Sequence, residues 1–153
     1  MKKTPFILLV LILLPLLLHA PPRVDVKESQ QRMKKEYERD KILEVIMEKE
    51  SNFNTKAVNK RENAVGILQI RPVMVREVNK ILRRQGDSIQ YTLADRFDST
   101  KSVAMYYTFQ RARNPEYDPQ IACYLWNGGT RTAKKLSHQY WLSVKDKLCQ
   151  QTQ

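Results

Sequence analysis

Hydrophobic positions after residue 40 recur at steps of three and four, which is the spacing of one face of a helix. Leu43, Ile46 and Met47 form such a stripe, and Glu50 continues it in line. The pattern predicts a helix over residues 29–49 that is dense in charge at first and amphipathic in its second half. This helix therefore places a carboxylate at its C-terminal end, on its buried face.

Further apolar stripes predict helices along most of the remaining chain. The expected helices begin at Pro72, at a cap formed by Asp98 or Ser99, within "QIACYLW", which "NGG" ends, and near Thr130. Their apolar faces are expected to carry Met74, Val75, Val78, Ile81 and Leu82, then Val103, Tyr106, Tyr107 and Phe109, and finally Ala133, Tyr140, Trp141, Val144 and Leu148.

The segments between these helices are less regular. Residues 51–63 read as a loop rich in Asn and Ser, with Phe53 and Val58 as expected anchors in the core. The run "AVGILQI" is apolar but too short to assign to a helix or a strand. Because the chain has only four glycines and no alternating apolar pattern, the predicted fold class is mostly α, as a single helical domain.

The first 20 residues differ in character from the rest of the chain. Lys2 and Lys3 precede an apolar run that ends at Leu18, and Ala20 offers a small residue for cleavage. Residues 1–20 therefore read as a signal peptide and 21–153 as the folded domain. Pro21 would follow the cleavage point and is a poor protease substrate, so an uncleaved membrane anchor stays open. Either outcome implies an exported, periplasmic or extracellular protein.

The net charge narrows the range of partners. A formal charge of +11 suits a polyanionic surface or polymer, such as a cell wall or acidic lipid heads, although it also serves solubility alone. The export signal and the absence of zinc-finger, RNP-type or basic-zipper patterns argue against nucleic acid. The sequence contains neither CxxC nor HExxH, so no metal or other cofactor is expected.

The two cysteines, Cys123 and Cys149, lie in the predicted domain. In an oxidising compartment they are expected to form one disulfide. A catalytic thiol is disfavoured because His138 is the single histidine after residue 20 and no motif pairs it with a cysteine.

Glu50 is the first candidate for chemistry. Burial on an apolar stripe and the negative end of the helix dipole both disfavour the ionised carboxylate, and so raise its pKa. A glutamic acid kept protonated near neutral pH can act as a general acid. The alternative is that Glu50 only marks the point at which the helix leaves the core.

Three short segments favour a functional role for Glu50 over a structural one: "ESNFNTKAV", "AVGILQIRP" and "YLWNGG". Their order resembles the soluble lytic transglycosylases, lysozyme-like enzymes that cut bacterial peptidoglycan. The resemblance covers residues 41–135, and its first two motifs are the specific ones. The matching positions are Glu50, Ser51, Phe53, Ala57 and Val58 in the first motif, Ala64, Gly66, Gln69, Ile70 and Pro72 in the second, and Asn127 and Gly129 in the third.

This resemblance implies a lysozyme-like fold and a mechanism. Glu50 would protonate the leaving oxygen of a MurNAc-GlcNAc β-1,4 bond and then, as a base, help the C6 hydroxyl close a 1,6-anhydro ring. No water is consumed, so a second carboxylate is dispensable. The implied partner is the peptidoglycan glycan strand, bound by a monomer. The implied substrate-binding residues are Ser51, Gly66, Gln69, Tyr124, Trp126 and Asn127.

The third motif departs from the family, because Leu125 and Trp126 stand where the family has Ala and Tyr. An indole can stack and donate a hydrogen bond but cannot accept one. Tyr124 could supply a hydroxyl if the register differs, or be a core residue at helical spacing from Ile121. Structural roles are also open for Ser51 and Gln69, and Gly66 either lets the backbone approach a sugar or adopts a turn conformation closed to other residues.

Two other functions therefore stay open. One is a water-using muramidase that recruits a second carboxylate in space, although Glu62 reads as loop surface and Asp98 as a helix cap. The other is a catalytically silent protein that binds glycan or cell wall.

Overall fold

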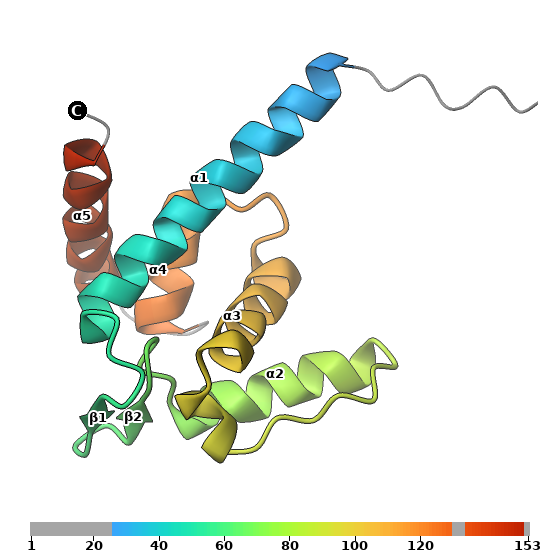
Figure 1. The fold of residues 1–153 in the computed structure, drawn as a ribbon, viewed down its shortest axis with the longest axis vertical. Helices are drawn as coiled ribbons and strands as arrows, with labels where there is room; N and C mark the ends of the chain where they lie inside the picture. Colours follow the sequence, from blue (N-terminus) through green and yellow to red (C-terminus); the bar gives the residue numbers. More distant parts are fainter. Residues whose placement is uncertain (1–25, 130–133, 152–153) are drawn as a thin grey trace, which may run out of the picture.

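The computed structural model describes residues 26–129 and 134–151, so the predicted signal peptide and Ala133 lie outside the described part of the chain. Helices make up most of that part, which confirms the expected fold class (Figure 1). The elements are α1 (Val26–Ser51), β1 (Val58–Asn59), β2 (Ala64–Val65), α2 (Pro72–Arg84), the 3-10 helix η1 (Ala94–Phe97), α3 (Ser99–Arg113), α4 (Pro119–Gly128) and α5 (Lys134–Gln150).

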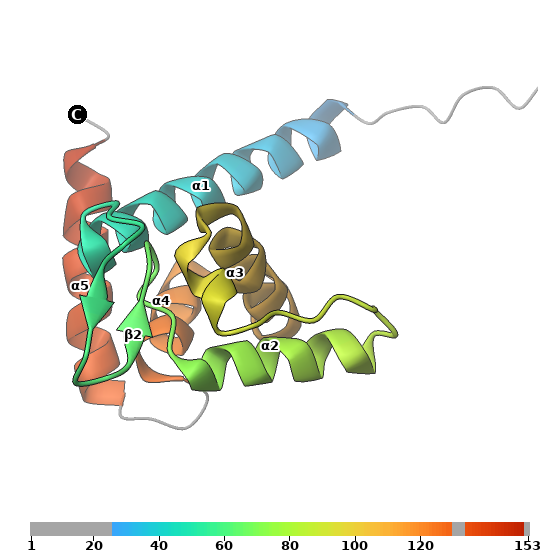
Figure 2. The ribbon, with the colours of Figure 1, turned by 60° about the horizontal axis from the view of Figure 1, so that its bottom comes forward.

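The helices pack around the second half of α1. Its first half extends away from the other helices, whereas its C-terminal half contacts α4 and α5 (Figure 1). Helices α2 and α3 pack on each other, and the antiparallel β1–β2 hairpin joins α1 to α2 (Figure 2). The five α-helices and the turn between β2 and α2 contribute to one apolar core: Ile42, Leu43, Val45, Ile46, Ile67, Leu68, Ile70, Val75, Val78, Ile81, Leu82, Met105, Tyr106, Phe109, Cys123, Trp126 and Val144.

Helix boundaries follow the expected local signals. Pro72 is the first residue of α2, where its missing N–H costs no hydrogen bond. The Asp98 carboxylate caps α3 by accepting a hydrogen bond from the backbone N–H of Lys101 at 3.0 Å. Helix α4 ends at Gly129, whose φ of 65° is costly for residues with a Cβ. These three predictions are confirmed.

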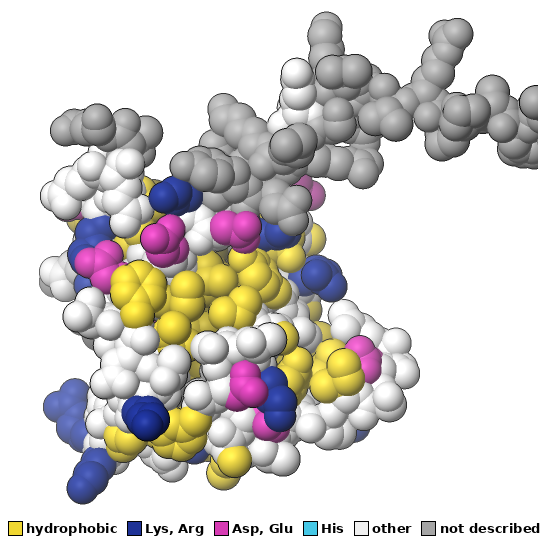
Figure 3. Space-filling model, in the orientation of Figure 1, with side chains coloured by type: hydrophobic (Ala, Val, Ile, Leu, Met, Phe, Trp, Pro, Cys, Tyr) yellow, Lys and Arg dark blue, Asp and Glu magenta, His cyan; other side chains and the backbone are white. Residues whose placement is uncertain are grey.

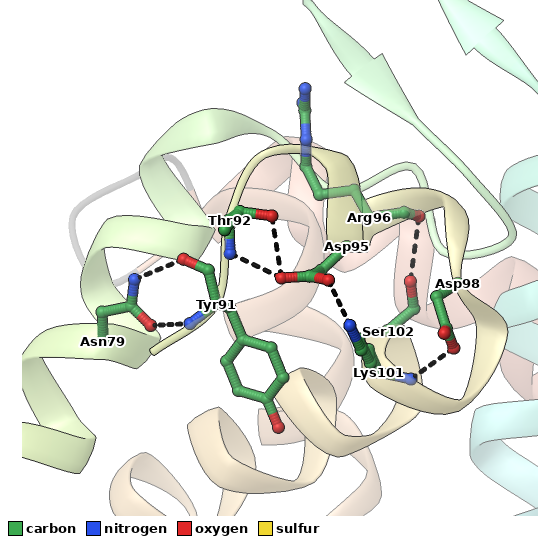
Figure 4. A network of polar contacts seen from close by, with 8 residues as sticks. All are labelled: Asn79, Tyr91, Thr92, Asp95, Arg96, Asp98, Lys101 and Ser102. Carbon is green, nitrogen blue, oxygen red and sulfur yellow. Dashed lines mark hydrogen bonds and ion pairs between the residues drawn. The ribbon is translucent and has the colours of Figure 1, made fainter. Parts of the chain in front are cut away.

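The segment between α2 and α3 is held by side chains (Figure 4). The Asn79 amide donates to the backbone carbonyl of Tyr91 and accepts from its N–H, both at 2.8 Å. The Asp95 carboxylate accepts hydrogen bonds from the N–H and hydroxyl of Thr92 and from the Lys101 ammonium. This network fixes η1 beside the start of α3.

Several packing predictions are wrong. Phe53 and Val58, the expected loop anchors, are 45% and 55% exposed, because backbone and side-chain hydrogen bonds rather than apolar anchors hold this loop. The segment "QIACYLW" was expected to form a short buried helix, but Ile121 on α4 is 46% exposed.

The expected disulfide is not formed in the structure. Cys123 is fully buried in the core on α4, whereas Cys149 is exposed on the last turn of α5, so the two thiols face different surroundings. Burial raises the pKa of the Cys123 thiol to about 12, which keeps it protonated and unreactive.

None of the helices within 26–129 and 134–151 has the length and apolar character that crossing a bilayer demands.

Candidate active site

A cleft of about 580 Å³ lies where four segments meet. Its walls come from the C-terminal end of α1, the β1–β2 hairpin, the start of α2 and the end of α4 (Figure 2 shows the hairpin, α2 and α4). Glu50, Gln69, Trp126 and Asn127 all line it, so the structure brings together residues from all three sequence motifs. The other lining residues are Asn59, Glu62, Ala64, Ile70, Arg71, Val73, Met74, Glu77, Leu125, Gly128 and Gly129.

Glu50 lies one residue before the end of α1 and is partly buried at the cleft wall. Its burial raises the pKa of the carboxyl above the ordinary value. The Tyr140 hydroxyl, which donates to Glu50 Oε1 at 2.7 Å, and the nearby charges of Lys49 and Arg71 act in the opposite direction without cancelling the effect. The carboxyl therefore retains its proton to higher pH than an exposed glutamic acid does.

Tyr140 is the contact that sequence reasoning missed. It reaches Glu50 from α5, and the pattern marked it only as a residue of that helix's apolar face. Burial, together with the neighbouring Glu50, raises the pKa of the Tyr140 phenol, so that it stays a hydrogen-bond donor. The Lys49 ammonium lies 5.2 Å from the centre of its ring. The one signal of this contact in the sequence was the hydroxyl of Tyr140, a polar group on an apolar helix face.

Ser51 and Gly66 do not line the cleft, and both contact the backbone of neighbouring segments. The Ser51 hydroxyl donates to the carbonyl of Ile67 at 2.8 Å, which ties the end of α1 to the turn after β2. Gly66 has a φ of 79°, and a Cβ there would lie 1.9 Å from the carbonyl oxygen of Arg96. The glycine is therefore required by close packing against η1, and a sugar contact does not explain it.

Gln69 lines the cleft and also braces it. Its side-chain nitrogen donates to the carbonyls of Gly66 at 3.0 Å and Ala57 at 3.4 Å. Its φ of 47° is uncommon for a residue with a side chain and belongs to the tight turn between β2 and α2. The structural role that the sequence left open for this amide is thus present at the edge of the cleft.

The α4 residues divide between the cleft and the outside. Trp126 is 8% exposed, packs edge-on against Tyr106 with ring centres 5.0 Å apart, and presents its remaining surface to the cleft. The backbone carbonyl of Asn127 accepts a hydrogen bond from Arg71 Nη2 at 3.4 Å. Tyr124 does not line the cleft, and its hydroxyl instead contacts Gln120 and His138.

Two further carboxylates reach the cleft, Glu62 and Glu77. Glu77 is paired with Arg113. Glu62 is exposed, as expected of a loop residue, and lies 3.5 Å from Arg71 Nη1, while its charge adds a minor upward contribution to the pKa of Glu50. Asp87, Asp95 and Asp98 do not line it.

Arg96 is a structural residue that no motif indicated. It is 6% exposed, and its guanidinium donates to the carbonyls of Leu93, Asn63 and Ile70 at 2.8–3.1 Å. Burial lowers its pKa. The contacts hold the hairpin, and with it the cleft wall, against η1. Backbone carbonyls leave no trace in side-chain patterns, so the sequence could not indicate these partners.

Comparison with known proteins adds one finding to this geometry. The family described as Transglycosylase SLT domain matches residues 27–146, which includes every segment that forms the cleft. A search of the curated proteins found no match. The family comprises lytic transglycosylases and implies binding to peptidoglycan. The chain belongs to the Transglycosylase SLT domain family.

Proposed function

We propose that the protein is an exported peptidoglycan lytic transglycosylase that cleaves the MurNAc-GlcNAc β-1,4 bond and leaves a 1,6-anhydro-MurNAc end. The cleft accommodates a glycan strand between the hairpin and the end of α4. Glu50 gives its proton to the leaving glycosidic oxygen as the bond to the anomeric carbon breaks. The resulting carboxylate takes the proton of the C6 hydroxyl, whose oxygen bonds the anomeric carbon. Glu50 ends protonated, and no water is consumed.

The observation that carries this proposal is the state of Glu50. A partly buried carboxyl with a raised pKa faces the cleft and is contacted by a phenol that stays protonated. The Tyr140 hydroxyl stabilises the carboxylate that exists between the two proton transfers, because a hydrogen bond to a charged acceptor is stronger than one to a neutral acceptor. One residue can therefore serve as acid and then as base.

The departure in the third motif does not remove phenol chemistry from the site. Trp126 replaces the family tyrosine, but Tyr140 brings a hydroxyl to Glu50 from another helix. Trp126 offers the cleft an apolar edge against which a sugar ring can pack. These features favour an active enzyme over a silent glycan-binding protein.

A second candidate function rests on Glu62. This carboxylate lines the same cleft as Glu50 and lies close enough to affect its pKa, so it could activate a water in a muramidase reaction. Arg71 Nη1 lies 3.5 Å from Glu62 Oε2 and holds this carboxylate at the cleft.

Digestion of purified peptidoglycan followed by mass spectrometry distinguishes these functions. A transglycosylase gives 1,6-anhydro ends, whereas a muramidase gives reducing ends that are heavier by one water. Glu62→Gln should leave the anhydro product unchanged, and Glu50→Gln serves as the inactive control. Reducing ends from wild-type protein would establish the hydrolase, and the absence of any cleavage would leave glycan binding as the function.

A further inference from the structure

Arg71 occupies a position in the cleft that the mechanism does not use. It lies inside the second motif, between Ile70 and Pro72, and immediately precedes α2. Among the described residues it is the single Lys or Arg that lines the cleft, where the other ionisable side chains are Glu50, Glu62 and Glu77. Its charge also opposes the high pKa of Glu50, so its presence beside the acid is not explained by proton donation.

The guanidinium spans the cleft between two walls. Nη1 lies 3.5 Å from Glu62 Oε2 on the hairpin, and Nη2 lies 3.4 Å from the carbonyl oxygen of Asn127 on α4. Both separations are at the long end for such contacts, and the side chain is 44% exposed. A guanidinium has five N–H donors in a planar fork, so this one can exchange its loose protein contacts for a carboxylate held by two parallel hydrogen bonds.

We propose that Arg71 determines specificity by binding a carboxylate carried by the muramyl residue of the glycan strand. This inference rests on the proposed function, since it assumes that the strand lies in the cleft beside Glu50. It assigns to Arg71 the recognition of a substrate group that does not react.

Two parts of the substrate supply this chemistry. The lactyl substituent of a muramyl residue ends in a free carboxylate when the peptide stem has been removed. When the stem is present, that carboxyl is an amide and the nearest carboxylates belong to the stem. A chain of N-acetylglucosamine carries neither group. The three ligands therefore separate recognition of a carboxylate from recognition of the sugar backbone.

The test measures binding by isothermal titration calorimetry in the Glu50→Gln background, where the ligands stay intact. The ligands are chitotetraose, glycan fragments stripped by an amidase, and fragments that keep their stems. Arg71→Gln is compared with Arg76→Gln, which removes the same charge from an exposed residue of α2 outside the cleft. Arg71→Lys keeps the charge but loses the fork, and melting curves verify the fold.

Arg71→Gln should weaken binding of a carboxylate-bearing ligand by about five- to tenfold relative to chitotetraose, as expected for a partly exposed hydrogen-bonded charge. Arg76→Gln should keep the wild-type preference, and Arg71→Lys should recover part of it. A loss confined to stripped fragments identifies the lactyl carboxylate, and one confined to stem-bearing fragments identifies the stem. Undetectable binding of both carboxylate-bearing ligands, or an Arg71→Gln preference equal to that of wild type, would overturn the inference.

Cleavage is scored separately on protein with Glu50 intact. If that protein releases no glycan product, the proposed function fails while the binding preference remains measurable. If it cleaves normally but Arg71 has no influence on preference, the inference fails and the proposed function stands.

Discussion

Two carboxylates, Glu50 and Asp95, show how this fold gives the same chemical group opposite properties. Glu50 is partly buried, its one hydrogen-bond donor among the described residues is the Tyr140 hydroxyl, and burial raises its pKa. Asp95 on η1 is also partly buried, yet its pKa is lowered to about 2, first by the Lys101 ammonium and then by the N–H and hydroxyl of Thr92 (Figure 4).

The difference lies in what replaces water around each carboxylate. Donors surround Asp95 and stabilise its charge, so the group is ionised at neutral pH and joins η1 to α3. Glu50 is buried and accepts a hydrogen bond from the Tyr140 hydroxyl, but in the described part of the chain it has no cationic donor like Lys101, so its carboxyl keeps its proton to higher pH than an exposed glutamic acid does. A structural carboxylate and a candidate acid can thus be distinguished by their surroundings.

The largest expected effect comes from Glu50→Gln. The amide cannot donate the proton, so activity should fall by about 10²–10⁴-fold or more, measured as anhydro-product release. Fold and glycan binding should persist, because the amide oxygen can still accept from Tyr140. Cleavage at the wild-type rate would remove Glu50 from the mechanism.

The same substitution should not lower stability, although it lowers activity. Because the folded pKa of Glu50 is raised, the native state is destabilised as pH rises from the unfolded value, about 4.3, through the folded value. Glu50→Gln should therefore melt at or above the wild-type temperature at pH 7, and the two proteins should converge below pH 4. A markedly lower melting temperature at pH 7 would contradict the burial argument.

Trp126→Ala should have the next largest effect, on stability. The side chain is 8% exposed and packs against Tyr106, so truncation should cost about 3–5 kcal/mol of unfolding free energy in a denaturant titration. Because one surface lines the cleft, glycan affinity should also fall in the fraction that remains folded. Trp126→Phe should recover most of the stability. Full affinity in folded Trp126→Ala protein would confine the residue to the core.

Local signals in the sequence predicted the features that neighbouring residues determine, namely helix starts and the buried faces of helices. The stripe through Leu43 and Ile46 placed Glu50 on a buried face, and Pro72 and Asp98 marked helix starts. Contacts between distant segments could not be predicted in this way. Tyr140 is 90 positions from Glu50.

The contacts that the sequence did not indicate, and the packing predictions that are wrong, have the same origin. The packing of Gly66 against Arg96 joins separate loops, and a glycine in a motif gives no indication of its partner. Phe53 was expected to anchor its polar loop in the core, but hydrogen bonds hold that loop instead. The positions of Cys123 and Cys149 depend on how α4 and α5 face each other, which spacing alone does not determine.

A smaller effect is expected from Tyr140→Phe. This change removes a hydrogen-bond donor from Glu50 and so widens the difference between its surroundings and those of Asp95. Loss of the hydroxyl removes the side-chain contact that lowers the pKa of Glu50, so that pKa should rise further. The limb of the pH–activity profile governed by Glu50 should move to higher pH, and activity at its optimum should fall by about tenfold through loss of one charge-assisted hydrogen bond.

Tyr124→Phe is the matched control for this change, because its hydroxyl contacts Gln120 and His138 outside the cleft. It should leave the pH profile in place. A shift of equal size in both variants would indicate a general effect of hydroxyl loss on the packing of α4 and α5. It would contradict a specific effect of Tyr140 on the pKa of Glu50.

The smallest effect is expected from Asp95→Asn, and it should affect stability without affecting glycan cleavage. Because the folded pKa of Asp95 is depressed to about 2, its contribution to stability is present above the unfolded value, about 3.9, and is lost as pH falls toward 2. The melting temperature of Asp95→Asn should therefore lie below wild type at pH 7 and approach it between pH 4 and 2. Lys101→Ala should show the same pH dependence. Because each substitution removes the same ion pair, the double variant should lose less stability than the sum of the losses in the two single variants. A deficit that stays constant down to pH 2 would show that shape rather than charge joins η1 to α3.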